Sequence, residues 1–349
     1  MMKKLTLEEK IGQKLILGCN SSDVDLLVEM IKKYHIGGVI LYKKNYSSYE
    51  EMVDVINRLK TANKDNKIPL FISIDQEGGR VNRLPSEFEK ILNIYDMSKK
   101  DKKLVYENGL ITGKILSSLG INMNLAPVID LYNNSSKVLY KRCFYENTSD
   151  CGIEYINGLK KYNIIATPKH FPGHGVSRMD SHLLIPYIWS KKLVNEHMKP
   201  FEEIINGGID SLMVGHLMIR GMSGLSSTSI SHSFIKKYIR DKYNYQGLIV
   251  TDEVGMLSRG GLFLGHILKK AILSDGDLIL LKVNQNNKKI IDKVISCVSG
   301  SKDVINVDKS VNRILKIKDK YNINDELVIE DKNIFKVNRE IEKINKLSL

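Results

Sequence analysis

The 349-residue sequence predicts an α/β protein, a single-domain (β/α)8 barrel of the TIM type with a charged C-terminal helical tail. Eight short apolar runs lack strict apolar–polar alternation, which is typical of parallel strands buried on both faces. Longer segments with helical spacing separate the runs, and no linker interrupts the alternation. A doubly wound open sheet is the competing arrangement. We expect the barrel over residues 1–320 and the tail over residues 321–349. The predicted strands are KLILGC (14–19), GGVILY (37–42), PLFISID (69–75), INMNLAPV (121–128), IIATPKH (164–170), SLMVGHL (211–217), GLIVTDE (247–253) and DLILL (277–281).

Capping residues and apolar spacing predict the helices between these runs. Thr6 and Ser48 are each followed three residues later by Glu, which is the pattern of a capping box. Residues 262–273 carry an apolar stripe at three-to-four spacing. Pro200 suits the first turn of a helix that Gly207 and Gly208 can end.

Composition narrows the class of protein. The formal charge of +13 comes from lysines spread along the chain, so we expect a solvated basic surface and no nucleic-acid partner. The four cysteines form no C-x-x-C pair and predict reduced thiols. No apolar run approaches membrane-spanning length, and the first residues do not resemble a signal peptide. We therefore expect a cytoplasmic protein without membrane insertion, and a monomer as the default.

Polar residues close four of the apolar runs. Asp75 ends the third run, Lys169 and His170 end the fifth, His216 lies near the end of the sixth, and Asp252 ends the seventh. A charged group that closes an apolar strand is costly in a core but useful at the mouth of a barrel. The carboxyl ends of barrel strands build the active site, so these residues predict one.

The segment IDQEGGRVNRLP (74–85) contributes further polar side chains. Asp75 and Arg83 are candidates for binding ligand hydroxyl groups, as a carboxylate acceptor and a guanidinium donor. For Glu77 and Arg80 we expect a structural role, in which the two side chains pair with each other and brace the loop.

The segment KHFPGHGVSRMDSHLLIP (169–186) crowds histidines around two glycines. A metal site built from His170, His174 and His182 is one interpretation, but the spacing matches no familiar metal motif. We favour an acid/base pair formed by Asp180 and His182, because a carboxylate orients an imidazole and favours its protonated form. We expect no metal and no cofactor.

Asp252 is the candidate nucleophile. A positioned carboxylate can attack an anomeric carbon and form a covalent glycosyl-enzyme. The alternative is an aspartate that only caps the next helix.

Several motifs together resemble glycoside hydrolase family 3, in its single-domain β-N-acetylhexosaminidase branch. They are DQEGGRVNR, NLAPVID, RCF, KHFPGHG with DSH, MVGHL and LIVTDE, in this order between residue 5 and the last apolar run. The resemblance implies that Asp252 is the nucleophile, with His182 as acid/base and Asp180 as its orienting partner. It further implies that Asp75, Arg83, Arg142, Lys169 and His170 bind the N-acetylglucosamine ring.

The resemblance implies a retaining β-N-acetylglucosaminidase that hydrolyses peptidoglycan fragments (muropeptides) or chito-oligosaccharides by double displacement. Two departures from the family pattern, Glu253-Val254-Gly255 after the nucleophile and Tyr140-Lys141 before Arg142, concern contacts beyond the bound ring. Two alternatives stay open. A histidine acid/base does not repel phosphate, so an N-acetylglucosaminide phosphorylase is one, and a catalytically inactive amino-sugar-binding protein is the other.

Overall fold

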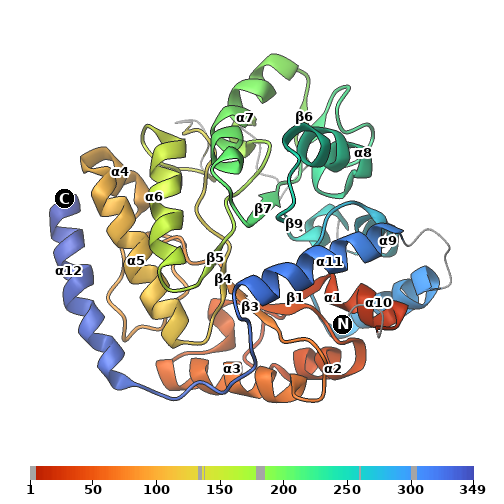
Figure 1. Ribbon diagram of the computed structural model, residues 1–349, viewed down its shortest axis with the longest axis horizontal. Helices are drawn as coiled ribbons and strands as arrows, with labels where there is room; N and C mark the ends of the chain where they lie inside the picture. Colours follow the sequence, from red (N-terminus) through yellow and green to blue (C-terminus); the bar gives the residue numbers. More distant parts are fainter. Residues whose placement is uncertain (1–4, 133–135, 137, 178–184, 259–260, 300–304) are drawn as a thin grey trace.

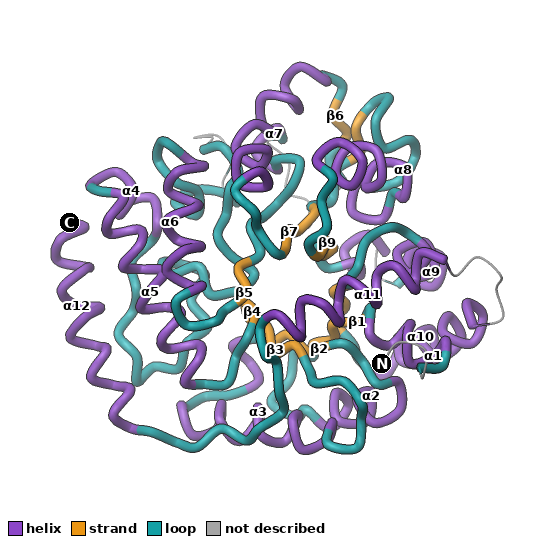
Figure 2. Tube along the Cα trace, viewed as in Figure 1, coloured by secondary structure: helices purple, strands orange, loops and turns teal. Residues whose placement is uncertain are grey.

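The computed structural model describes residues 5–132, 136, 138–177, 185–258, 261–299 and 305–349. Short strands ring the centre of the molecule, and helices lie outside them (Figures 1 and 2). Six of the strands form one parallel sheet in the order β10-β1-β2-β3-β4-β5, and β7 pairs with β9. The barrel strands are β1 (Leu15–Gly18), β2 (Gly38–Leu41), β3 (Phe71–Ile74), β4 (Met123–Asn124), β5 (Ile165–Ala166), β7 (Ser211–Val214), β9 (Leu248–Thr251) and β10 (Ile279–Lys282).

Two isolated parallel bridges close the ring. Phe171, just after β5, pairs with Val214 of β7, and Val250 of β9 pairs with Leu278 beside β10. The chain therefore forms a closed eight-stranded parallel barrel, and the open-sheet alternative is excluded. Each barrel strand lies in one of the eight predicted runs, with β10 reaching one residue further. The predicted fold is confirmed.

Helices follow most of the strands, as the barrel requires. Among the described residues, no helix is both long and apolar enough to cross a membrane. The α-helices are α1 (Leu7–Gln13), α2 (Asp25–Tyr34), α3 (Tyr49–Asn63), α4 (Ile94–Lys100), α5 (Lys102–Ser118), α6 (Thr148–Lys160), α7 (Lys191–Asn206), α8 (His232–Ile235), α9 (Leu264–Leu273), α10 (Gln285–Ser299), α11 (Ile305–Lys320) and α12 (Val337–Ser348). Shorter helical turns are η2 (Lys43–Asn45), η3 (His174–Val176), η4 (Thr228–Ile230), η5 (Lys236–Asp241), η6 (Val254–Ser258) and η7 (Lys332–Lys336), and a separate ribbon pairs β6 (Tyr187–Ile188) with β8 (Met218–Ile219).

The helix starts agree with the sequence in part. Thr6 forms the complete capping box with Glu9, whereas the carboxylate of Glu51 accepts from Ser47 and only the Ser48 hydroxyl caps α3. The prediction for Pro200 was wrong, because it lies inside α7, which begins at Lys191 behind a Ser190 cap. The proline removes one N–H from the helix but is buried with an apolar face, which favours continuation of the helix.

The barrel interior is a packed core that α11 closes at the amino ends of the strands. Inward-facing side chains such as Ile16, Phe71 and Met213 form one apolar cluster with Ile314 and Ile317 of α11. Beyond α11 the chain runs along α3 and ends in α12, which packs against α5 and α4 (Figure 1). The barrel is therefore sealed at one end.

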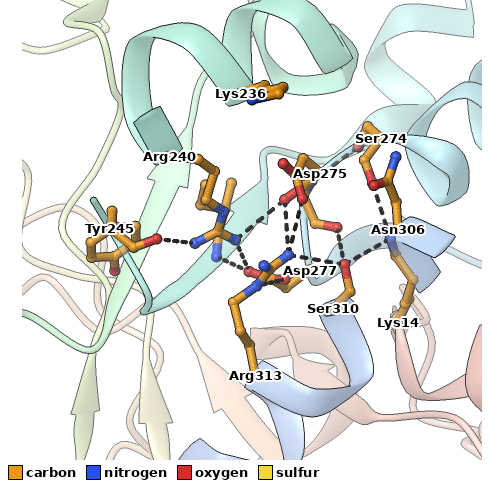
Figure 3. A network of polar contacts seen from close by, with 12 residues as sticks. Lys14, Lys236, Arg240, Tyr245, Ser274, Asp275, Asp277, Asn306, Ser310 and Arg313 are labelled. Carbon is orange, nitrogen blue, oxygen red and sulfur yellow. Dashed lines mark hydrogen bonds and ion pairs between the residues drawn. The ribbon is translucent and has the colours of Figure 1, made fainter. Parts of the chain in front are cut away.

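A buried ionic network lies at this sealed end (Figure 3). Asp277, just before β10, is fully buried and accepts from Arg240 through Oδ2 (2.5 Å) and from Arg313 through Oδ1 (2.7 Å). Its Oδ2 also accepts the backbone N–H of Ile249 (2.7 Å). Lys14, equally buried, donates to the carbonyl of Ile272 (2.7 Å). This network joins η5, α11 and the starts of β1, β9 and β10.

Candidate active site

A cavity of about 310 Å³ opens at the carboxyl ends of the barrel strands. Its walls contain six of the residues selected from the sequence, and they come from segments far apart along the chain. Asp180 and His182, the predicted acid/base pair, lie outside the described residues. The six residues that the cavity brings together are Asp75, Arg83, Arg142, Lys169, His170 and Asp252.

Asp252 follows β9 directly and is half-buried in the cavity wall. Its Oδ1 accepts the backbone N–H of Glu253 (2.8 Å), and its own N–H donates to the carbonyl of Val214 on β7. Burial raises the pKa of Asp252. The imidazoles of His216 and His170 and the backbone N–H of Glu253 outweigh burial and bring the pKa to about 2. The side chain is therefore an anion at neutral pH, with Oδ2 free of partners among the described residues.

A chain of ion pairs forms another part of the wall. The Nζ of Lys169 contacts Asp75 (2.7 Å) and Glu77 (2.7 Å), and its side chain is only 3% exposed. Glu77 in turn accepts two parallel bonds from Arg142, each 2.8 Å long. Burial raises the pKa of Glu77, but Lys169 and Arg142 outweigh it and hold the pKa far below its usual range. The proposed pairing of Glu77 with Arg80 was wrong, because Arg80 bonds to the carbonyl of Val138 instead.

Asp130 holds the two histidines of the KHFPGH segment. This carboxylate is fully buried, and its Oδ2 accepts from Nδ1 of His170 at 2.7 Å. Its Oδ1 accepts the backbone N–H of His174. With Nδ1 bound, His170 presents Nε2 without a protein partner in the described part of the chain. Asp130 therefore sets the orientation of His170.

His174 lies beside His170 in the same wall. Its ring is buried, and neither nitrogen has a hydrogen-bond partner among the residues that the structure describes. Burial and the neighbouring His170 lower the pKa of His174, so its imidazole is neutral at pH 7. A buried polar ring without partners is rare in a folded protein and is common where a ligand or water completes the bonding.

Two cations at the cavity have no carboxylate partner among the described residues. Arg83 uses its backbone in bonds with Gln76 and Tyr46, and no bond of its guanidinium is seen. Lys282, which ends β10, lies with Nζ 4.7 Å from the ring centre of Tyr42. The cavity that contains the carboxylate of Asp252 therefore also contains two cations without a carboxylate partner among the described residues.

His216 lies behind the cavity wall and does not line the cavity. It is fully buried, with Nδ1 2.7 Å from the Ser229 hydroxyl and Nε2 2.9 Å from the carbonyl of Glu253. Glu253 itself lines the cavity, and its Oε1 accepts the N–H groups of Gly255 and Lys282. His216 thus ties the end of the sixth barrel strand to the residue after Asp252.

Glycines permit two of the turns that carry these side chains. Gly78 (φ +84°) and Gly79 (φ +57°) lie in the left-handed region between Asp75 and Arg83. Gly173 (φ +119°) packs so closely on α7 that a Cβ would lie 2.7 Å from Cβ of His197. The described residues hold no group of three or more histidine, cysteine or carboxylate side chains arranged for a metal ion.

Sequence reasoning missed Asp130 and Lys282 as members of this site, gave Glu77 only a bracing role and considered His174 only as part of a metal site. Asp130 carried a usable signal, because it ends the NLAPVID segment at the fourth strand, as Asp75 and Asp252 end theirs. Glu77 carried none, since its partners lie 65 and 92 residues away along the chain.

Comparison with known proteins agrees with this geometry. Residues 6–317 match the family described as "Glycosyl hydrolase family 3 N terminal domain". The chain is 28% identical to the beta-hexosaminidase A of Pseudoalteromonas piscicida, and the match covers 90% of this chain but only 61% of that protein. It is 30% identical to a beta-hexosaminidase of Glaesserella parasuis, and that match covers 72% of this chain and 75% of the relative. A solved family 3 beta-N-acetylglucosaminidase from Paenibacillus sp. str. FPU-7 superposes with a TM-score of 0.86 at 28% identity, covering 99% of this chain and 69% of that one. The family predicted from the sequence is therefore confirmed, and the chain belongs to glycosyl hydrolase family 3.

Proposed function

We propose that the protein is a retaining β-N-acetylglucosaminidase that removes terminal β-linked N-acetylglucosamine from muropeptides or chito-oligosaccharides. The observation that carries the proposal is the ionised Asp252 in a cavity shared with Asp75, Lys169 and His170. A cavity of about 310 Å³ is at the small end of ligand pockets, which favours one terminal sugar ring over an internal stretch of chain. The names of the relatives support the choice of an amino sugar.

The proposed reaction is a double displacement. The free carboxylate oxygen of Asp252 attacks the anomeric carbon, while His182 gives its proton to the leaving oxygen. His182 then takes a proton from water, whose oxygen displaces Asp252 and releases the sugar with its β-configuration retained. Asp180 orients His182 and favours its protonated form. A pKa near 2 keeps Asp252 ready as a nucleophile throughout the neutral range.

The ion-pair wall is proposed to hold the sugar. Asp75 can accept further hydrogen bonds from a ligand in the cavity. The Nε2 of His170 can donate or accept one, because its Nδ1 is the nitrogen bound to Asp130. Arg142 uses three of its N–H groups on Glu77 and Val138 and keeps two for hydroxyl groups. Arg83, without a carboxylate partner, completes the set.

Covalent trapping tests the nucleophile and the substrate together. A 5-fluoro N-acetylglucosaminyl fluoride should inactivate the enzyme, and peptide mass spectrometry should find the added sugar on Asp252. The matched 5-fluoro glucosyl fluoride should label far more slowly. Attachment to Glu253 or Asp75, or equal labelling by both reagents, would contradict the proposal.

Product analysis separates the reaction classes. With water as acceptor, NMR should show β-N-acetylglucosamine as the first product, unchanged by added phosphate. A sugar 1-phosphate that appears with phosphate would favour the phosphorylase. Absence of turnover on every N-acetylglucosaminide, with binding retained, would favour the inactive binding protein.

We also propose a cytoplasmic location. All four cysteines are free thiols, three of them buried, which accords with a reducing compartment. Activity found outside the cell membrane after fractionation would contradict it.

A further inference from the structure

The ribbon of β6 and β8 carries the only tryptophan of the chain on its solvent face. Side chains alternate along it, so Ile188 and Ile219 are buried beneath while Tyr187 and Trp189 point outward. Trp189 is 67% exposed and Tyr187 is 42% exposed. Large aromatic side chains left in water on one small face commonly mark a binding surface.

The two rings and a neighbouring cation form an ordered group. The Tyr187 and Trp189 ring centres are 4.9 Å apart with an edge-on angle of 64°. The guanidinium carbon of Arg220 lies over the indole, 5.1 Å from its centre. The backbone N–H of Arg220 donates to the carbonyl of Ile188 (2.9 Å), which fixes the arginine beside the tryptophan. Arg220 makes no ion pair within the described residues, so its donors face solvent.

The ribbon lies at the same end of the barrel as the cavity. His216, whose Nε2 contacts the carbonyl of the cavity residue Glu253, is four residues before Arg220. Four residues of extended chain span at most about 14 Å. The ribbon is therefore within reach of the units of a bound glycan that extend beyond the cavity.

The surroundings of the ribbon are basic. Residues 185–195 and 211–240 contain no aspartate or glutamate, and they include Lys191, Lys192 and Arg220. The ammonium of Lys191 lies next to Gly221, 3.0 Å from where a Cβ would be. Within these two described segments the charged side chains are all basic, and an aromatic surface beside them suits a ligand that combines an apolar ring face with a negative charge.

We propose that Tyr187, Trp189 and Arg220 bind a carboxylate-bearing pyranose ring of the leaving-group chain. The C–H face of the sugar packs on the open side of the indole, and Arg220 and Lys191 donate to the carboxylate. The assignment rests on the proposed function, since it places this ring on the far side of the cleaved bond. It makes the ribbon a determinant of substrate length and charge.

The single tryptophan makes the binding step directly measurable. In the Asp252→Asn variant, which prevents turnover, indole emission should change saturably on titration with a tetrasaccharide of alternating N-acetylglucosamine and N-acetylmuramic acid. The methyl ester of the same tetrasaccharide, or the Arg220→Gln variant, should bind about tenfold more weakly. No emission change, or equal binding of acid and ester, would overturn the proposal. Emission that depends on protein concentration without ligand would overturn it too, because a second copy would then cover the ribbon.

Kinetics separate this surface from the cavity. Trp189→Ala should lower kcat/KM about tenfold on the tetrasaccharide and leave a chromogenic N-acetylglucosaminide unchanged. Ile329→Ala, at an 87% exposed position on the tail, is the matched control and should change neither. An equal loss on both substrates, or none on the tetrasaccharide, would refute the role of the ribbon. If the chromogenic substrate is not cleaved at all, the proposed function fails, while the emission titration still tests the ribbon.

Discussion

The two ends of the barrel both contain buried charges, yet they differ in what those charges contact. At the sealed end Asp277 has both oxygens occupied by Arg240, Arg313 and a backbone N–H (Figure 3). At the open end, within the described part of the chain, Asp252 has one oxygen occupied and His174 has neither ring nitrogen bonded. Asp277 therefore uses both of its oxygens inside the protein, whereas Asp252 and His174 keep bonding capacity for a ligand. Among the described residues the contrast lies in the carboxylates, since Asp277 is fully bonded and Asp252 is not, whereas Nε of buried Arg240 at the sealed end also lacks a partner.

The largest effect should come from the open end. Asp252→Ala removes the proposed nucleophile, so kcat on a chromogenic N-acetylglucosaminide should fall by about 10⁴-fold. The urea midpoint should remain within the range of a folded protein, because the side chain makes a single bond to the fold. Near-normal activity would assign the chemistry to another residue.

Asp277→Asn tests the sealed end. It leaves buried Arg240 without a carboxylate partner among the described residues and removes one of the two carboxylates that contact Arg313, so we expect a loss of about 3 kcal/mol in the free energy of unfolding. Below the unfolding transition kcat/KM should stay within about twofold of wild type. Asp275→Asn, which removes one 3.2 Å contact to Arg313, is the milder control. A large loss of kcat/KM in folded Asp277→Asn protein would show that the two ends are coupled.

Asp130→Asn probes a buried carboxylate that serves the open end. The variant weakens the bond that orients His170, so kcat/KM should fall about 10- to 100-fold, the value of a charge-assisted hydrogen bond. Ser229→Ala removes the hydroxyl that bonds to Nδ1 of His216, a histidine that does not line the cavity. It should lower kcat/KM much less than Asp130→Asn. Equal effects of the two changes would contradict the assigned roles.

The smallest effect concerns pH and the sealed end. Burial lowers the pKa of Lys318 to about 7, with Asp325 opposing this, and its Nζ donates to the carbonyls of Gly37 and Pro69. Between pH 7 and 9 the unfolded lysine holds a proton that the folded one releases, so the free energy of unfolding rises with pH. Lys318→Met should reduce that rise by about 1 kcal/mol per pH unit. Replacing exposed Lys320 by Met should leave the slope unchanged, and an unaltered slope in Lys318→Met would contradict the shift.

The sequence predicted the parts of this molecule that depend on local pattern. Strands buried on both faces leave continuous apolar runs, and the residue that closes such a run, as Asp75 and Asp252 do, lies at the mouth. Pairings across the barrel leave no such trace. Glu77 was expected beside Arg80 but pairs with Arg142, because the fold brings that distant segment closer in space. The β6–β8 ribbon was not predicted, because neither of its strands lies in one of the eight apolar runs and the two pair only in the folded chain.

The helix α11, which closes the amino end of the barrel, determines how ligands can enter and leave. Ile314 and Ile317 fill the space that a channel would need, so ligands cannot pass through the barrel from one end to the other. The proposed reaction therefore uses a single opening, at the carboxyl ends of the strands, for the glycan, the incoming water and both products. In a double displacement the leaving group and the attacking water occupy the same face of the sugar, so the departing chain leaves before water takes its place.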